Sequence, residues 1–337
     1  MTTFTATWHL LAESDRLRRS SQAFSALGAE AFVFGGELLP REPVDNSIDR
    51  VSIRAGANLS TETVTAPATA PSPRVGSPSA TAGDAVYLFS GRGGIAMAPV
   101  EEKGALWRYT PRDNAWEAIT PADPAAPVPA GRSYHCLASD GTDTLFLHAG
   151  CPESGRLADL WAFNLTSRVW AQLPDAPPPS RGGASIAFQD GKVYRLNGFD
   201  GQTEQGGALD VYDVAAGSWS THEYKPDGVE GPEARSVSAL VALEVRGRKT
   251  LVTLFGERDP SSLGHAGAGK MLADAWAFDV SERRWAKIQS VGGAKAPAPR
   301  GWFDADVAGE DGRQFVLVHG GLAEDNSRLG DVWKLEF

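Results

Sequence analysis

The chain has 337 residues and a formal net charge of -10 at pH 7, with 37 Gly and 22 Pro. This acidic balance argues against a general nucleic-acid binder and against binding to an anionic membrane surface. Two cysteines, no signal-peptide pattern and no apolar run of about 18 residues argue against a secreted disulfide scaffold and a helical membrane span. The expected location is therefore cytoplasmic. The many glycines and prolines indicate many turns between short strands.

An apolar strand that ends in small residues recurs six times along the chain. The copies are Phe32–Gly36, Tyr87–Gly91, Phe146–Gly150, Tyr194–Gly198, Val252–Gly256 and Val316–Gly321. Their mean spacing is about 57 residues, close to the ~50-residue period of one class of β-propeller repeat. Below we call these segments the Gly-ended strands.

Two further strands follow most copies, and one precedes each. An aromatic strand comes first, as in Asp159–Phe163, and a strand with a single Trp follows after a short polar link, as at Trp170. Short polar links between alternating strands are typical of hairpins. Each unit opens with an Arg-containing loop and a strand of small residues, as in Gly131–His135. The repeat therefore predicts four antiparallel strands per unit.

One four-stranded sheet cannot bury both of its faces, but several sheets packed radially can, which predicts a β-propeller. The last unit stops at Phe337 without its Trp strand, and Trp8–Leu11 is similar to the Trp strand Trp285–Ile288. We therefore predict one all-β domain, residues 1–337, folded as a six-bladed propeller whose N-terminal strand completes the last blade. This closure would remove two exposed strand edges. The first blade is the least regular, with Ile48–Val51 in place of an aromatic strand.

The Gly-ended strand, the aromatic strand and the spaced Trp together resemble the kelch repeat over nearly the whole chain. Within that family, Phe255–Gly269 and Asp274–Asp279 are similar to the metal loop of the plant specifier proteins, the nitrile-, epithio- and thiocyanate-forming proteins of glucosinolate breakdown. There a Glu, an Asp four residues later and a His four residues after that are taken to hold ferrous iron. Glu257 and His265 stand at the first and third positions, and Ser261 stands at the second.

The resemblance implies an Fe(II) site formed by Glu257, His265 and either Ser261 or Asp259. One imidazole and one or two carboxylates suit ferrous iron, and the glycines that flank His265 would let the loop fold back. Without a metal, Glu257 and His265 could act as an acid/base pair. The structural alternative is a surface loop in which both residues make ordinary hydrogen bonds.

An arginine precedes the first strand of every unit. The six are Arg19, Arg74, Arg132, Arg181, Arg235 and Arg300. In a propeller these positions lie on a ring around one mouth of the channel, where guanidiniums suit a sulfate, carboxylate or phosphate. We expect most of the six to cap carbonyls and acidic groups of the fold. The candidates for substrate contact are Arg132, Arg181 and Arg300.

Two single positions complete the candidate site. Arg92, which follows the second Gly-ended strand, resembles an arginine that specifier proteins use for the substrate sulfate. Trp302 stands at the start of a first strand where the other units have small residues, so it could stack on a ligand at the channel mouth.

The sequence predicts a small-molecule enzyme with its site at the channel mouth. The resemblance implies a ferrous-iron-dependent lyase or rearrangement catalyst that acts on an anionic or sulfur-containing molecule, with Glu257, His265 and Arg92 as catalytic residues. One alternative is a kelch protein–protein interaction module, which would show a surface patch and no deep pocket. The other is a metal-free cyclase or isomerase of a biosynthetic pathway. No nucleic-acid or membrane partner is expected.

Overall fold

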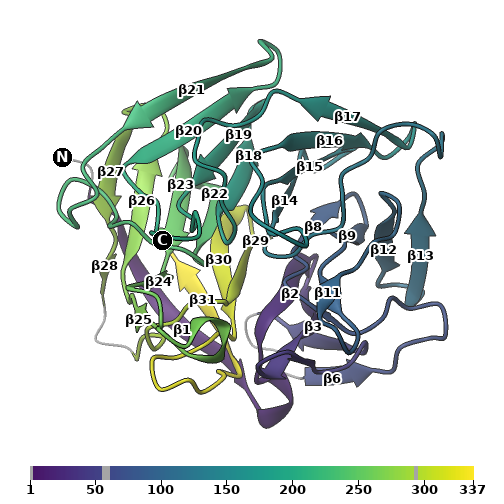
Figure 1. Ribbon diagram of the computed structural model, residues 1–337. Helices are drawn as coiled ribbons and strands as arrows, with labels where there is room; N and C mark the ends of the chain where they lie inside the picture. The colour runs from purple at the N-terminus through teal and green to yellow at the C-terminus, as the bar shows by residue number, and fades with distance from the viewer. Residues whose placement is uncertain (1–2, 55–60, 292–294) are drawn as a thin grey trace.

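The computed structural model describes residues 3–54, 61–291 and 295–337, and of His265 it describes the backbone alone. Regular structure in these ranges is almost entirely β-strand, with two 3-10 turns, η1 (Asp15–Leu17) and η2 (Gly264–Ala266). The sheets stand side by side around a common centre (Figure 1). The prediction of an all-β fold built of four-stranded antiparallel sheets is confirmed. No helical segment in the described ranges has the length and apolarity that a membrane crossing requires.

The described residues form six sheets of four or more strands, and five of these sheets begin at an inner strand and run outward in chain order. The first sheet consists of β2 (Ser20–Leu27), β3 (Glu30–Leu39), β5 (Ile48–Ser52) and β6 (Thr61–Val64), with β4 (Glu42–Pro43) beside β3. The second consists of β8 (Ser79–Ala82), β9 (Ala85–Phe89), β12 (Leu106–Thr110) and β13 (Ala115–Ile119). The third consists of β14 (Cys136–Ser139), β15 (Thr144–His148), β16 (Leu160–Asn164) and β17 (Val169–Leu173).

The remaining large sheets follow the same plan. The fourth consists of β18 (Ser185–Gln189), β19 (Lys192–Leu196), β20 (Ala208–Asp213) and β21 (Ser218–Glu223). The fifth consists of β22 (Ala239–Val245), β23 (Arg248–Leu254), β26 (Ala275–Asp279) and β27 (Arg284–Lys287). The sixth consists of β29 (Asp304–Glu310), β30 (Arg313–His319), β31 (Asp331–Glu336), β1 (Thr5–Glu13) and β28 (Gln289–Ser290).

Two small sheets include short strands from the loops that follow two of the Gly-ended strands. One small sheet consists of β7 (Arg74–Val75), β10 (Arg92–Gly93) and β11 (Ala98–Pro99), and another of β24 (Glu257–Arg258) and β25 (Lys270–Met271). These short pairings fix the backbones of Arg92 and Glu257, two of the predicted site residues.

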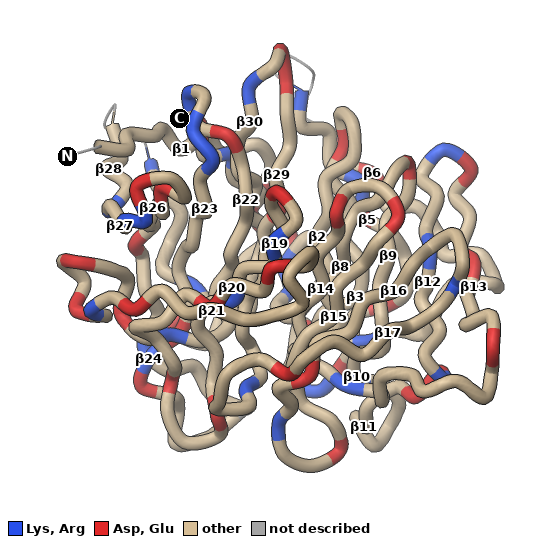
Figure 2. Tube along the Cα trace, turned by 90° about the horizontal axis from the view of Figure 1, so that it is seen from above, with Lys and Arg blue, Asp and Glu red and all other residues tan. Residues whose placement is uncertain are grey.

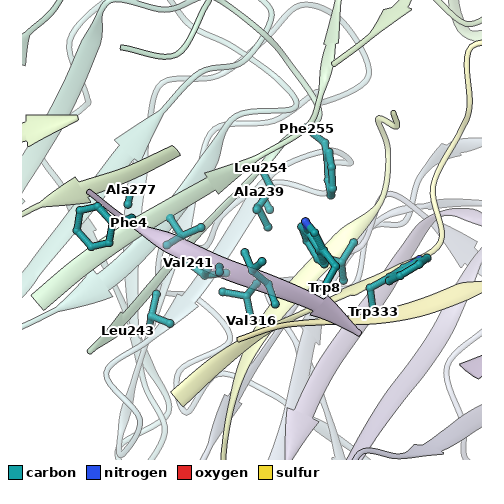
Figure 3. Close-up of a cluster of buried hydrophobic side chains, with 14 of the residues drawn as sticks. Phe4, Trp8, Ala239, Val241, Leu243, Leu254, Phe255, Ala277, Val316 and Trp333 are labelled. Carbon is teal, nitrogen blue, oxygen red and sulfur yellow. The ribbon is translucent and has the colours of Figure 1, made fainter. Parts of the chain in front are cut away.

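The N-terminal strand β1 pairs antiparallel with β31, so that Trp8 lies opposite Leu335 and Leu10 opposite Trp333. Trp8 also stacks on Phe255 of the fifth unit, with ring centroids 5.8 Å apart. Figure 3 shows Trp8 among the buried side chains between the fifth and sixth sheets. Strand β1 is therefore held by backbone pairing with β31 on one edge, by a short parallel pairing with β28 on the other, and by aromatic packing on its face.

The hydrophobic core is divided into clusters that each lie between two neighbouring sheets. The inner strands also contact one another in the cyclic order β2, β8, β14, β18, β22, β29 and back to β2. Each sheet thus buries both faces against its neighbours, which is how the radial arrangement solves the burial problem of a single sheet.

A closed cycle of backbone hydrogen bonds runs around the centre. Its members, which we call the collar, are Ser21, Gly76, Tyr134, Gly183, Val237 and Trp302. Each N–H donates to the carbonyl of the collar residue in the preceding unit, and Ser21 donates to Trp302, with N···O distances of 2.8–3.1 Å. All six have φ between +45° and +60°. This left-handed conformation is unfavourable for residues other than glycine, so the hydrogen bonds of the cycle must stabilise it.

Candidate functional site

A cavity of about 540 Å³ lies above the collar, on the side from which the loops after the Gly-ended strands project. Figure 2 shows β10, β11 and β24 together at this side of the molecule. Tyr134 and Trp302 line this cavity and also a second one of about 490 Å³, which follows the inner strands on the other side of the collar. The collar is therefore the floor of the upper cavity. Its size suits a small molecule.

Glu257 is a buried carboxylate in the wall of this cavity, with 3% of its surface exposed. Its backbone forms two hydrogen bonds with Ser236, both of 2.9 Å, and its Oε1 accepts a bond of 2.5 Å from the N–H of Gly269. Burial raises the pKa of Glu257 to about 7, and the nearby carboxylate of Glu204 adds to this rise. Its proton therefore equilibrates near neutral pH, as a general acid or base requires.

The loop after Glu257 folds back, as its glycines predict. A Cβ at Gly267 would collide with Ser261 Oγ, and a Cβ at Gly269 would lie 2.7 Å from Glu257 Oε1. Ser261 lines the cavity together with Glu257. The two glycines thus leave room for two of the predicted ligand atoms.

The other predicted metal ligands are placed differently. Asp259 has a left-handed backbone with φ 52°, its side chain is 75% exposed, and it does not line the cavity. The side chain of His265 lies outside the described part of the structure, although its backbone is in η2. Among the described side chains, no group of three or more His, Cys, Asp and Glu is arranged to hold a metal ion.

Glu204 is a second cavity carboxylate, and the sequence did not reveal it. It lies in the loop between β19 and β20 of the neighbouring sheet. Its Oε1 is shielded from solvent and has no hydrogen-bond partner among the described residues. Burial raises the pKa of Glu204, and the carboxylates of Asp259 and Asp200 raise it further.

Arg92 lines the cavity and is held by neutral acceptors. Its Nε donates to Ser133 Oγ at 2.7 Å, and its terminal nitrogens donate to the carbonyls of Met97 at 3.1 Å and Pro152 at 2.9 Å. Three of its five N–H donors are used. In the described structure no carboxylate neutralises this guanidinium, which therefore retains its charge and two donors for an anion.

Arg156 is a second guanidinium in the same wall, and it was not predicted. Its Nε donates to the Phe199 carbonyl at 3.1 Å, and its guanidinium carbon lies 5.4 Å from the centre of the Phe199 ring. It also has no carboxylate partner among the described residues. Two uncompensated guanidiniums thus face one cavity of a protein that is acidic overall.

The six recurring arginines lie outside this cavity. All are buried, and each donates to the carbonyl at the end of its Gly-ended strand, as Arg132 does to Ala149 at 3.1 Å and Arg300 to Gly320 at 2.9 Å. Five of them also pair with a carboxylate: with Asp49, Glu102, Asp159, Asp274 and Asp331. In the fourth unit Arg181 binds only carbonyls, and Arg195 pairs with Asp210.

The predicted substrate-binding residues therefore differ in position: one lines the cavity and three do not. Trp302 is brought into the cavity as a floor residue, half-buried, where its indole could stack on a ligand. Arg132, Arg181 and Arg300 do not line the cavity, because their guanidiniums are directed into the fold by carbonyls and, for Arg132 and Arg300, by acidic partners. Their placement is the carbonyl-capping one expected for most of the six.

Known proteins resemble this chain in sequence and in fold. A family model described as the KLHDC2/KLHL20/DRC7 Kelch-repeats domain matches residues 21–256. An N-(sulfonatooxy)prop-2-enimidothioate sulfolyase from Thlaspi arvense is 27% identical over 94% of this chain and 91% of its own length. The Drosophila melanogaster leucine-zipper-like transcriptional regulator 1 homolog is 23% identical over 100% of this chain and 33% of its own length.

Two further similarities are narrower. One is to a part of a larger protein, and the other is a similarity of fold alone. Mouse multiple epidermal growth factor-like domains protein 8 is 25% identical over 73% of this chain, which corresponds to 8% of its own length. A solved structure of YjhT superposes with a TM-score of 0.71 over 98% of this chain and 100% of that chain, at 13% identity. The resemblances predicted from the sequence, to kelch repeats and to a plant specifier-type sulfolyase, are confirmed by these matches.

Proposed function

The chain belongs to the kelch-repeat family, and from this premise we propose that it is an enzyme of the lyase or rearrangement type, acting on a small sulfated molecule in the upper cavity. One observation carries the proposal: Arg92 and Arg156, without carboxylate partners among the described residues, share the cavity with the buried carboxylate of Glu257. The printed name of the Thlaspi arvense relative describes a sulfolyase with a sulfonatooxy substrate. An anion site beside a carboxylate with pKa near neutral fits that chemistry.

We also propose that the six large sheets are six blades of a closed ring, completed by β1 as fourth strand of the last blade. The collar supports this, because its hydrogen bonds return from Trp302 to Ser21. The cyclic contacts of the inner strands and the pairing of β1 with β31 support it as well.

Each of the cavity residues has a separate role in the proposed reaction. The free donors of Arg92 and Arg156 bind the sulfate oxygens, since a guanidinium matches the planar spacing of two such oxygens. Trp302 packs against the remaining side chain of the substrate from the floor. If no metal is bound, Glu257, with its pKa of about 7, holds or moves a proton at its free oxygen as the sulfate leaves.

The proposed cofactor is one ferrous ion, held by Glu257 and Ser261 with His265. The fit rests on the positions of Gly267 and Gly269, where a Cβ would fill the space beside Ser261 Oγ and Glu257 Oε1. A bound ferrous ion would supply a Lewis acid that polarises a sulfur or oxygen of the substrate. Asp259, the alternative third oxygen donor, faces solvent, so Ser261 is the better-placed residue.

The interaction-module alternative predicts a surface patch without a deep pocket, whereas this face carries a cavity of about 540 Å³. The metal-free cyclase or isomerase differs from the lyase in its response to a chelator. The enzyme proposal is therefore the one that the site geometry supports.

The test is sulfate release from N-(sulfonatooxy)prop-2-enimidothioate, followed by ion chromatography under anaerobic conditions with ferrous iron. We expect release above the protein-free rate for the wild type, and a large loss for Glu257→Gln, with melting temperature as the folding control. Activity that survives a chelator but not Glu257→Gln would indicate metal-free acid/base chemistry. Equal product and sulfate formation with and without protein would refute the proposal.

A further inference from the structure

The loop that carries Glu204 lies next to the segment that carries Glu257. The N–H of Arg235 donates to the carbonyl of Gln205 at 3.2 Å, and the following residue, Ser236, exchanges two hydrogen bonds of 2.9 Å with Glu257. Hydrogen-bonded segments lie about 4.8 Å apart, so the backbones of Glu204 and Glu257 are separated by roughly two such spacings, ~10 Å. Two glutamate side chains that enter one cavity can meet across this distance.

Both carboxylates do enter that cavity, and neither is neutralised by the described part of the protein. Glu257 Oε1 is occupied by the Gly269 N–H, and no Lys or Arg among the described residues pairs with Glu257. Glu204 Oε1 is shielded from solvent without a partner. Arg258, the residue after Glu257, turns away and binds Glu233 at 2.7 Å. Glu257 is buried without an ion-pair partner among the described residues, which is costly for a carboxylate, so a cation bound between it and Glu204 would stabilise it.

The position that the plant family fills with Asp carries Ser261 in this chain, and the serine hydroxyl is neutral. The loop provides no second carboxylate in its place, because Asp259 is exposed outside the cavity. Glu204, from the neighbouring sheet, is a carboxylate that lines the same cavity as Ser261.

We infer that Glu204 and Glu257 together bind one divalent cation, with Ser261 as a neutral oxygen donor, so that this site joins the loops of the fourth and fifth sheets. Oxygen donors of this kind suit Mn²⁺ and Fe²⁺. The inference depends on the proposed function only in that a metal is present. What it adds is the ligand Glu204, which lies outside the loop that carries Glu257, Ser261 and His265.

Binding of Mn²⁺ to the full chain, followed by loss of the free-ion signal in electron paramagnetic resonance, tests the inference without reference to activity. We expect about one ion per chain, and at least tenfold weaker binding for Glu204→Gln. The matched control is Glu153→Gln, which removes the same charge from another wall of the same cavity and should change the dissociation constant less than twofold. Anaerobic equilibrium dialysis with Fe²⁺ should rank the affinities of the wild type and the two variants in the same order.

A double variant addresses whether Glu204 acts as the substitute for the family's aspartate. Adding Ser261→Asp to Glu204→Gln should restore Mn²⁺ affinity to within about threefold of the wild type, which also shows that the Glu204 variant folds. Unchanged binding in Glu204→Gln, or no binding by the wild type, overturns the inference. Sulfate release that resists a chelator would then leave the proposed lyase standing without its metal.

Discussion

Two groups of arginines in this molecule lie in different surroundings. The six that recur in every unit are buried, cap the carbonyl of a Gly-ended strand and, in five units, pair with a carboxylate. Arg92 and Arg156 occur once each, bind only neutral acceptors and line the upper cavity. The arginines that all units share therefore stabilise the fold, and Arg92 and Arg156 are available to a ligand.

Asp304 and Asp306 limit this rule. They occur once, at inner-strand positions where the other units have uncharged residues, yet they serve the fold. Asp304 accepts the N–H of Phe24 and Asp306 that of Ala26, each at 2.8 Å, so they join β29 to β2 where the last unit meets the first. The channel encloses both carboxylates, and this burial raises the pKa of Asp304 to about 8 and that of Asp306 to about 6.

The strongest test of the comparison is Arg300→Ala. The change leaves Asp331 buried without its cation, and loss of one partner of a buried ion pair costs about 3–5 kcal/mol. We expect this loss in the free energy of unfolding, measured in urea. Arg92 lies in a cavity wall, where water can replace its hydrogen bonds, so Arg92→Ala in the same assay should cost only about 1 kcal/mol. If the two variants lose equal stability, the separation into structural and ligand-binding arginines is wrong.

Arg92→Ala and Arg156→Ala test the second half of the comparison, the ligand-binding role of the cavity arginines. A hydrogen bond to a charged group contributes about 1.5–3 kcal/mol, so each variant should raise KM for a sulfated substrate about 10- to 100-fold, with little change in melting temperature. Arg112→Ala, an exposed arginine on an outer hairpin, is the control and should leave KM unchanged. An unaltered KM in both cavity variants would remove the anion site.

Asp304→Asn tests whether a residue that occurs once can be purely structural. The folded-state pKa of about 8 lies above the ordinary value of about 3.9. The folded protein therefore binds this proton more tightly, and the resulting stability is complete below pH ~4 and is lost as the pH rises to about 8. The slope is at most about 1.4 kcal/mol per pH unit.

In Asp304→Asn, that part of the fall in stability between about pH 4 and 8 should disappear. Urea unfolding of wild type and variant at several pH values measures it. Identical slopes in the two proteins would contradict the assigned role. Substrate KM at fixed pH should be unaffected, which distinguishes this aspartate from the cavity residues.

The fold was predictable because its signals are repeated. Each Gly-ended strand supports the reading of the other five, so one irregular unit, such as that with β5, does not hide the pattern. The pairing partner of the N-terminal strand followed from the Trp8–Leu11 match, and Trp8 indeed lies opposite Leu335 of β31.

The site was predictable only in part, because loops that occur once have no internal copy to compare. Glu257, Ser261, Arg92 and Trp302 reach one cavity as expected. Glu204 and Arg156 come from irregular loops, where neither periodicity nor spacing indicates direction. Asp259 turns outward because its left-handed backbone reverses the chain at that point. The recurring arginines were predicted to line one mouth of the channel as positive charges. The sequence indicates their positions but not which carboxylates pair with them.

The pairing of β1 with β31 sets the order of events on the ribosome. Synthesis proceeds at about 5–20 residues per second, so roughly 16 to 64 s separate the addition of Glu13 from that of Asp331. Throughout that time β1 lacks its long antiparallel partner β31, while its apolar side chains, Trp8 among them, are already made. The nascent chain therefore carries β1 without this partner until β31 emerges, which makes β1 a natural place for a chaperone to bind.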